Sequence, residues 1–106
     1  MCIRDRVGQA LIKQNIALLR AADRSTILPQ DATKLAPGTA CDLVFLDPPY
    51  GQSLGQRALA SALAQGWIAS DALVVFEEAS PMAPEGFIMQ DTRKFGATTL
   101  TLLSPR

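Results

Sequence analysis

The chain has 106 residues, of which 48% are hydrophobic and 19% charged, a composition typical of one small globular domain with a modest core. Ten basic and ten acidic residues cancel, so the chain lacks the basic excess of a protein that grips nucleic acid unaided. No apolar run approaches the roughly 20 residues that a membrane-spanning helix needs, and we expect no membrane partner. Histidine is absent, which excludes Ser-His and Cys-His nucleophilic schemes and His-ligated zinc, so no metal site is expected.

The first six residues lack the apolar core of a signal peptide, so a cytoplasmic protein is expected. In that compartment a disulfide between Cys2 and Cys41 is disfavoured. Because Cys41 adjoins a predicted strand, we expect it to be a small buried hydrophobic residue.

The amino-terminal half of the chain predicts a helix and a weak strand. Residues 6 to about 22 form an amphipathic pattern, with Ile12, Ile16 and Leu19 recurring on one face. Residues 25–28 predict a weak strand, followed by a polar turn at 30–33. A strong strand over residues 42–46 comes next, and its apolar run predicts that it is buried.

The carboxyl-terminal half predicts a helix, a strand and a hairpin. Residues 53–56 fit a capping box, and the helix that they begin carries Leu59, Ala62 and Leu63 on one face and ends near Gly66. Residues 72–76 are continuously apolar, which predicts burial on both faces of the sheet. Residues 87–92 and 98–103 predict an antiparallel hairpin around a turn at 94–97. The order of elements favours an α/β sheet with an antiparallel edge.

The tetrapeptide Asp47-Pro48-Pro49-Tyr50 follows the strong strand, where parallel sheets place their ligands. The two prolines stiffen the turn and remove two N–H donors, so that its carbonyls stay available as acceptors. An acid, rigid carbonyls and an aromatic face suit a planar group that bears an amine. A plain turn is the alternative interpretation, because Asp and Pro both favour turns.

Residues 7 to 103 resemble the latter part of RsmD-type methyltransferases, bacterial enzymes that use S-adenosyl-L-methionine to methylate N2 of a guanine in 16S ribosomal RNA. The resemblance rests on four segments, namely Leu11-Ile12-Lys13-Gln14-Asn15-Ile16, Asp42-Leu43-Val44-Phe45-Leu46-Asp47-Pro48-Pro49-Tyr50, Gly66-Trp67-Ile68 and Phe95-Gly96-Ala97-Thr98. It implies an α/β fold: a partial Rossmann-like class I methyltransferase sheet with a carboxyl-terminal antiparallel hairpin, lacking the first two strands. The implied partner is 16S rRNA or a small-subunit assembly particle, and we expect a monomer.

The resemblance also implies a role for each motif residue. Asp47 and the Pro48 carbonyl would accept hydrogen bonds from the guanine amine, within a turn stiffened by Pro49, and Tyr50 would stack on a base flipped out of its helix. Asp31 and Ala32, together with Asp47, would contact the cofactor. From the residues alone, an exposed turn aspartate is the favoured interpretation of Asp31, and a cofactor contact is the alternative.

The family's glycine-rich cofactor loop and ribose-binding acid have no counterpart in this sequence. We therefore expect a single partial domain, with residues 1–5 a non-native leader and residues 6–104 family-like, that is inactive alone. The missing strands would leave the strand at 42–46 with an exposed apolar edge. A DNA adenine-N6 methyltransferase fragment and a non-catalytic α/β fragment remain alternatives.

Five further side chains have weaker functional interpretations. Glu77 and Glu78 end the second strong strand, where we expect a solvated strand end rather than a cleft lining. Arg93 and Lys94 form a two-residue basic cluster that offers weak support for a contact with RNA phosphates. Trp67 is expected to belong to the core rather than to a stacking platform.

Overall fold

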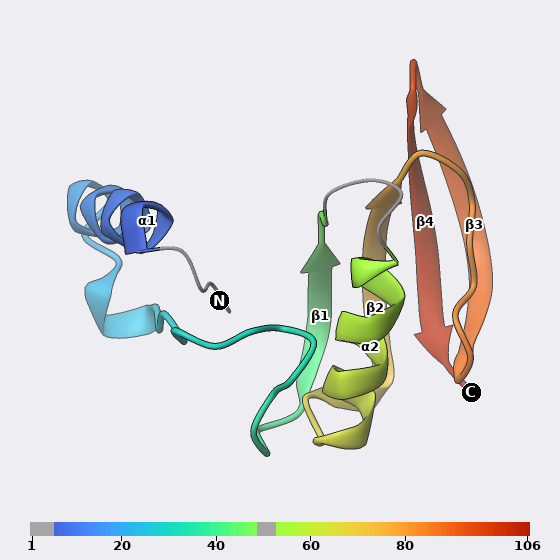
Figure 1. Ribbon diagram of the computed structural model, residues 1–106, viewed down its shortest axis with the longest axis horizontal. Coiled ribbons are helices and arrows are strands. Elements are labelled where there is room, and N and C mark those ends of the chain that lie inside the picture. Colours follow the sequence, from blue (N-terminus) through green and yellow to red (C-terminus); the bar gives the residue numbers. More distant parts are fainter. Residues whose placement is uncertain (1–5, 49–52) are drawn as a thin grey trace.

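The protein is described by a computed structural model over residues 6–48 and 53–106 (Figure 1). The expected leader at residues 1–5, and Pro49 and Tyr50 of the motif, lie outside the described residues. The elements in chain order are α1 (Arg6–Leu18), η1 (Ala22–Arg24), β1 (Cys41–Leu46), α2 (Leu54–Ala64), β2 (Ile68–Glu78), β3 (Phe87–Phe95) and β4 (Thr98–Pro105).

The four strands form one mixed sheet in the order β1-β2-β4-β3. β1 and β2 are parallel, with α2 as their crossover, whereas β4 pairs antiparallel with both β2 and β3. The hairpin of β3 and β4 turns at Gly96 and Ala97, and its positive φ of 62° at Gly96 suits a glycine. The predicted α/β fold with a carboxyl-terminal antiparallel hairpin is confirmed.

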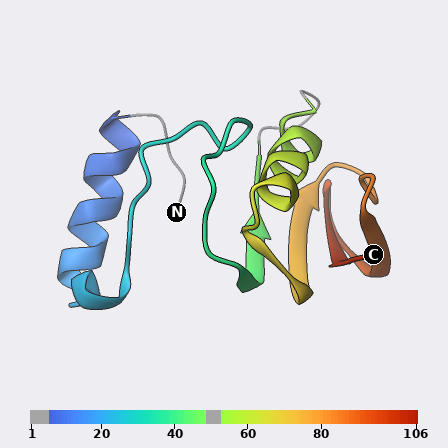
Figure 2. The same ribbon diagram turned by 90° about the horizontal axis from the view of Figure 1, so that it is seen from below.

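The core lies between α2 and one face of the sheet (Figure 2). Leu59 is the helix residue at its centre, and Ala62 and Leu63 pack against its edge, as their spacing predicted. The helix ends in a Schellman motif at Gly66, which has a φ of 81°. In that motif the Trp67 N–H donates to the Ala62 carbonyl at 2.9 Å. The remaining core residues come from the strands, namely Ile68, Ala72, Val74, Phe76, Phe87 and Leu103.

The beginning of α2 differs from the predicted capping box. Ser53 is the N-cap residue, but its φ is 55° and its side chain makes no capping hydrogen bond. A capping side chain needs an extended backbone to reach the amides of the first turn, and the left-handed conformation of Ser53 prevents this.

The second face of the sheet has no helix against it within the described part of the chain (Figure 2). The prediction that β2 is buried on both faces is therefore wrong, because its burial alternates and Leu73 is 40% exposed. β1 is likewise not a buried strand. It forms an edge of the sheet, and its Leu43 and Phe45 are 51% and 73% exposed. The predicted exposed apolar edge is confirmed.

The amino-terminal part of the chain lies apart from the sheet (Figures 1 and 2). α1 ends at Leu18 rather than near residue 22, and Arg20 beyond it has a φ of 52°. Ile12 and Ile16 are half-buried, but Leu19 of the predicted apolar face is exposed. Residues 25–28 form no strand, only an isolated bridge at position 28, because a strand needs a partner along its length.

The prediction for Cys41 is also wrong. Its side chain is exposed at the start of the edge strand, and its Sγ lies 3.6 Å from the Thr39 carbonyl oxygen. Among the described residues, no helix combines the length and the apolar character that crossing a bilayer requires.

Candidate functional site

The candidate site begins where β1 ends. Asp47 and Pro48 follow Leu46 directly, and because β1 and β2 are parallel, they lie at the carboxyl edge of this pair. Asp47 is exposed and Pro48 is half-buried. This is the edge at which open α/β sheets bind their ligands.

A turn at residues 31–34 forms the opposite wall. The Asp31 Oδ1 atom accepts hydrogen bonds from the Thr33 backbone N–H at 2.9 Å and from the Thr33 hydroxyl at 2.7 Å. The Lys34 N–H donates to the Asp31 carbonyl at 2.9 Å. Asp31 is half-buried, not the exposed turn residue that its sequence alone suggested. An Asp followed two residues later by Thr favours a turn of this kind, so this spacing is the sequence signal that could have identified Thr33.

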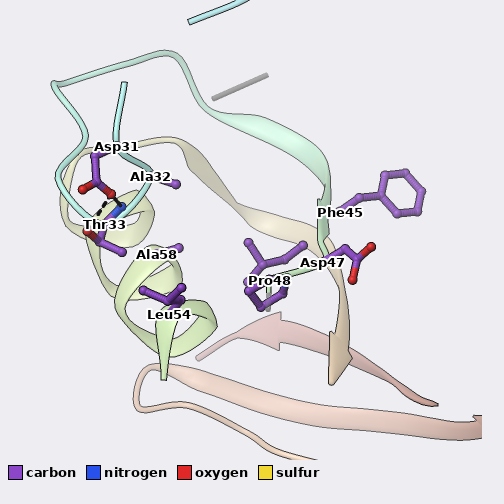
Figure 3. Close-up of a pocket in the computed structure, with 9 residues that line it drawn as sticks. Asp31, Ala32, Thr33, Phe45, Asp47, Pro48, Leu54 and Ala58 are labelled. Atoms are coloured by element: carbon purple, nitrogen blue, oxygen red, sulfur yellow. Dashed lines mark hydrogen bonds between the residues drawn. The ribbon is translucent and has the colours of Figure 1, made fainter. Parts of the chain in front are cut away.

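A pocket of about 330 Å³ lies between the turn and the end of β1 (Figure 3). It brings together Asp31 and Ala32 with Asp47 and Pro48, which are far apart in the sequence. Residues that sequence reasoning did not assign to the site complete its lining, namely Thr33, Phe45, Leu46, Leu54 and Ala58. Its volume is within the range of small-molecule sites.

The two acids stand at opposite ends of this pocket. Figure 3 shows the Asp47 carboxylate beside Phe45, on the far side of β1 from the Asp31 turn. Pro48 projects toward Leu54 at the centre, and the small Ala32 and Ala58 side chains leave space between. The alternation of a strand explains the arrangement, because residues 45 and 47 share one face and residue 48 the other. The pocket thus has polar ends and an apolar middle.

Gly55 allows α2 to lie close to the motif. A Cβ atom at this buried position would be 2.3 Å from Phe76 Cζ and 3.0 Å from Pro48 Cγ. Only glycine lets the first turn of the helix pack directly on these two side chains. The wall of the pocket formed by Pro48 and Leu54 therefore depends on this residue.

The side chains with weaker functional interpretations lie in different surroundings in the structure. Glu78 is 6% exposed and its Oε1 accepts a hydrogen bond from the Ala79 N–H at 3.0 Å, so the expected solvated strand end is wrong for this residue. Glu77 is half-buried. Trp67 is half-buried and packs beside Gly38, with its Nε1 donating to the Ala36 carbonyl at 2.8 Å. Within the described ranges, no three acidic or cysteine side chains are grouped to hold a metal ion.

Solved structures share this fold over nearly the whole chain. A protein from Escherichia coli assigned as a methyltransferase superposes with a TM-score of 0.85 at 22% identity, covering 99% of this chain and 62% of its own. A protein from Haemophilus influenzae assigned as a methylase gives 0.81 at 20% identity, covering 98% and 70%. A conserved hypothetical protein from Streptococcus pyogenes gives 0.79 at 24% identity, covering 99% and 69%.

Sequence comparison identifies relatives of known name. The ribosomal RNA small subunit methyltransferase D of two Escherichia coli strains is 35% identical over 72 residues, which is 67% of this chain. The chain spans only 36% of the length of these relatives. The family model described as Conserved hypothetical protein 95 matches residues 3–104. The chain therefore belongs to this family, the RsmD family, as the four sequence segments indicated.

Proposed function

We propose that this chain is part of an enzyme that transfers a methyl group from S-adenosyl-L-methionine to N2 of a guanine in 16S rRNA. The observation that carries the proposal is the single pocket lined by both Asp31 and Ala32 and by Asp47 and Pro48. The 35% identity to ribosomal RNA methyltransferases supports it. The enzyme would act as a monomer in the cytoplasm, on free 16S rRNA or on a small-subunit assembly particle.

The role proposed for the motif is to grasp and orient the amine of the base. The exposed Asp47 carboxylate would accept one N–H of the guanine amine, and the Pro48 carbonyl the other. These bonds would draw the nitrogen from planar conjugation, so that its lone pair points at the methyl donor. Tyr50, outside the described residues, would stack on the flipped base. Positioning does most of the work, since Asp47 need only accept a proton that turns acidic after transfer.

The pocket has features that fit part of the cofactor. Its apolar middle of Ala32, Leu54 and Ala58 suits a planar ring, and Asp31 and Asp47 supply acids at its two ends. Asp31 is held by its bonds to Thr33, which fixes this wall before a ligand arrives. S-adenosyl-L-methionine supplies a methyl group on a sulfonium, already activated for transfer to a nitrogen.

Isothermal titration with S-adenosyl-L-methionine tests the cofactor site of the 106-residue chain. We expect saturable heat, lost in Ala32→Trp because the indole fills the pocket. Ala60→Trp is the matched control, since Ala60 is exposed on α2 outside the pocket lining. A flat trace for the unmodified chain would favour the non-catalytic interpretation.

A methyl-transfer assay tests the substrate and the role of Asp47. The chain is joined to the part of the Escherichia coli relative that it does not match, and radiolabelled methyl groups are followed into RNA. A guanine-containing RNA should accept them, whereas the same RNA with inosine should not, because inosine lacks the N2 amine. Asp47→Ala should abolish transfer. Methylation of the inosine RNA or of adenine in DNA would contradict the proposed specificity, and full activity of Asp47→Ala would remove this residue from the mechanism.

A further inference from the structure

The hairpin of β3 and β4 carries side chains that the proposed function leaves unused. Its turn lies at the end of the sheet where β1 ends and extends beyond that edge (Figure 1). We call residues 93–97 the hairpin tip. They include Arg93, Lys94 and Phe95, followed by the turn at Gly96 and Ala97. The tip therefore lies at the same edge of the sheet as the Asp47 motif.

The pairing of the strands places Arg93 on the same face as Asp47. Leu46 pairs with Phe76, so the next residues along each strand, Asp47 and Glu77, are neighbours. Glu77 pairs with Leu100, which in turn pairs with Arg93. Residues that pair across a sheet share a face, so these four side chains form one row. Three strand spacings separate the two ends of the row, a distance of about 14 Å.

Phe95 lies two residues beyond Arg93 and therefore on the same face, about 7 Å further along the strand. It is 63% exposed, which is unusual for so large an apolar side chain at a turn. A Cβ atom at the adjacent Gly96 would meet nothing within 4 Å, so the surroundings of the tip are open. The ring is thus accessible to a planar partner.

Two cations of the hairpin tip lie near this ring, one on each face of the hairpin. Arg93 Nε lies 3.0 Å from Asp91 Oδ2, and this bond orients the guanidinium, whose terminal nitrogens take no part in it. Lys94 is also exposed, but because successive strand residues point to opposite faces, it lies on the other face of the hairpin from Phe95 and Arg93. Asp91, Arg93 and Lys94 together have a net charge of +1. An exposed aromatic ring with cations nearby is the combination that binds unpaired nucleotides, with the ring stacking on a base and the cations contacting phosphates.

We propose that the hairpin tip binds an unpaired RNA segment that flanks the target guanine. Phe95 stacks on a base of this segment, and Arg93 on the same face contacts a neighbouring phosphate. Lys94 contacts a further phosphate from the opposite face of the tip. This inference rests on the proposed function, since the distance of about 14 Å matters only if the target base occupies the Asp47 end of the row. Binding the same RNA strand both at the Asp47 motif and at the hairpin tip would also help a protein chain of zero net charge to hold RNA.

Fluorescence anisotropy with the 106-residue chain tests the inference. The probe is a fluorescein-labelled RNA of about 12 nucleotides, with uridines around a single guanine, a length that single-stranded sites accommodate. Phe95→Ala should weaken binding about 5- to 150-fold, the range of a lost stacked base, and Phe95→Trp should retain it. Lys94→Gln should make the negative slope of log K against log salt shallower by about 0.7, whereas Phe95→Ala should leave that slope unchanged.

Two control variants match these changes elsewhere in the molecule. Ile88→Ala removes an exposed apolar side chain from the other end of β3, and Lys13→Gln removes an exposed cation from α1. Both should bind the RNA like the unmodified chain. Circular dichroism verifies that each variant keeps the fold.

The outcomes separate this inference from the proposed function. If the unmodified chain binds RNA and Phe95→Ala binds equally well, the hairpin tip is not the contact, and the proposed function is unaffected. If binding depends on the tip but S-adenosyl-L-methionine gives no heat, the proposed function fails while the RNA contact holds. If the unmodified chain does not bind the RNA, the inference is overturned.

Discussion

Replacing Gly55 by alanine tests how closely α2 must approach the site. A Cβ atom at this position would lie 2.3 Å from Phe76 Cζ, 2.9 Å from Phe76 Cε2 and 3.0 Å from Pro48 Cγ. Contacts this short require a neighbour to move. Phe76 is 0% exposed and enclosed by the core, so its ring has no space to enter.

Two effects of opposite sign set the stability of Gly55→Ala. Alanine is the better helix former, which would stabilise the protein by up to about 1 kcal/mol. Forcing an extra methyl group into a packed core costs about 1 to 3 kcal/mol, and the rigid, buried ring of Phe76 places this case at the upper end. We therefore expect a net loss of about 2 kcal/mol in the free energy of unfolding.

Urea unfolding, followed by circular dichroism and by the fluorescence of Trp67, measures this loss. Ala60→Gly is the control for helix propensity, because Ala60 is exposed on the same helix, and it should cost about 1 kcal/mol. Combining Gly55→Ala with Phe76→Leu removes the ring atoms with which the methyl group collides. The double variant should therefore be less destabilised than the sum of the two single changes, by about 1 kcal/mol.

The reasoning would be refuted by a Gly55→Ala variant as stable as the unmodified protein, or more so. Helix propensity would then outweigh the contact with Phe76, and the close approach of α2 to Pro48 would not limit the structure. A loss of stability without coupling to Phe76→Leu would also contradict the steric explanation, because it would locate the strain elsewhere.

Two further predictions concern β4 and β3. Thr101 is 1% exposed, and its hydroxyl has no hydrogen-bond partner among the described residues. Thr101→Val should therefore raise the free energy of unfolding by about 1 kcal/mol. Thr99→Val is the control and should not raise it, because the Thr99 hydroxyl donates a hydrogen bond to the Ala79 carbonyl at 3.4 Å. The pKa of Asp91 lies below its ordinary value of 3.8 because the Thr92 N–H, and then Arg93, stabilise the carboxylate. The resulting stabilisation of the folded state is present above pH 3.8 and is lost as the pH falls through the lowered pKa. NMR titration of the Asp91 carboxyl group measures this pKa. Arg93→Gln should raise it, and an unchanged pKa would contradict the contribution assigned to Arg93.

Much of the fold followed from local sequence signals. The apolar run before Asp47, the spacing of Leu59, Ala62 and Leu63, and the turn at Gly96 each predicted the element that the structure contains. These signals succeed because they act within a few residues, through alternation, helical periodicity or a positive φ. Ser53 shows the limit of such reasoning, since its left-handed backbone prevents the capping bond that its residue type favours.

Burial and the site itself depended on segments that are distant in the sequence. An apolar strand predicts a covered face, yet Leu73 and Phe45 are exposed, because covering requires a helix that none of the described segments provides. In the same way, the sequence by itself determined that Asp47 ends a strand and that Asp31 lies in a turn. Only the tertiary structure decided that these two acids stand at opposite ends of one pocket, because that depends on how the chain folds back past α2.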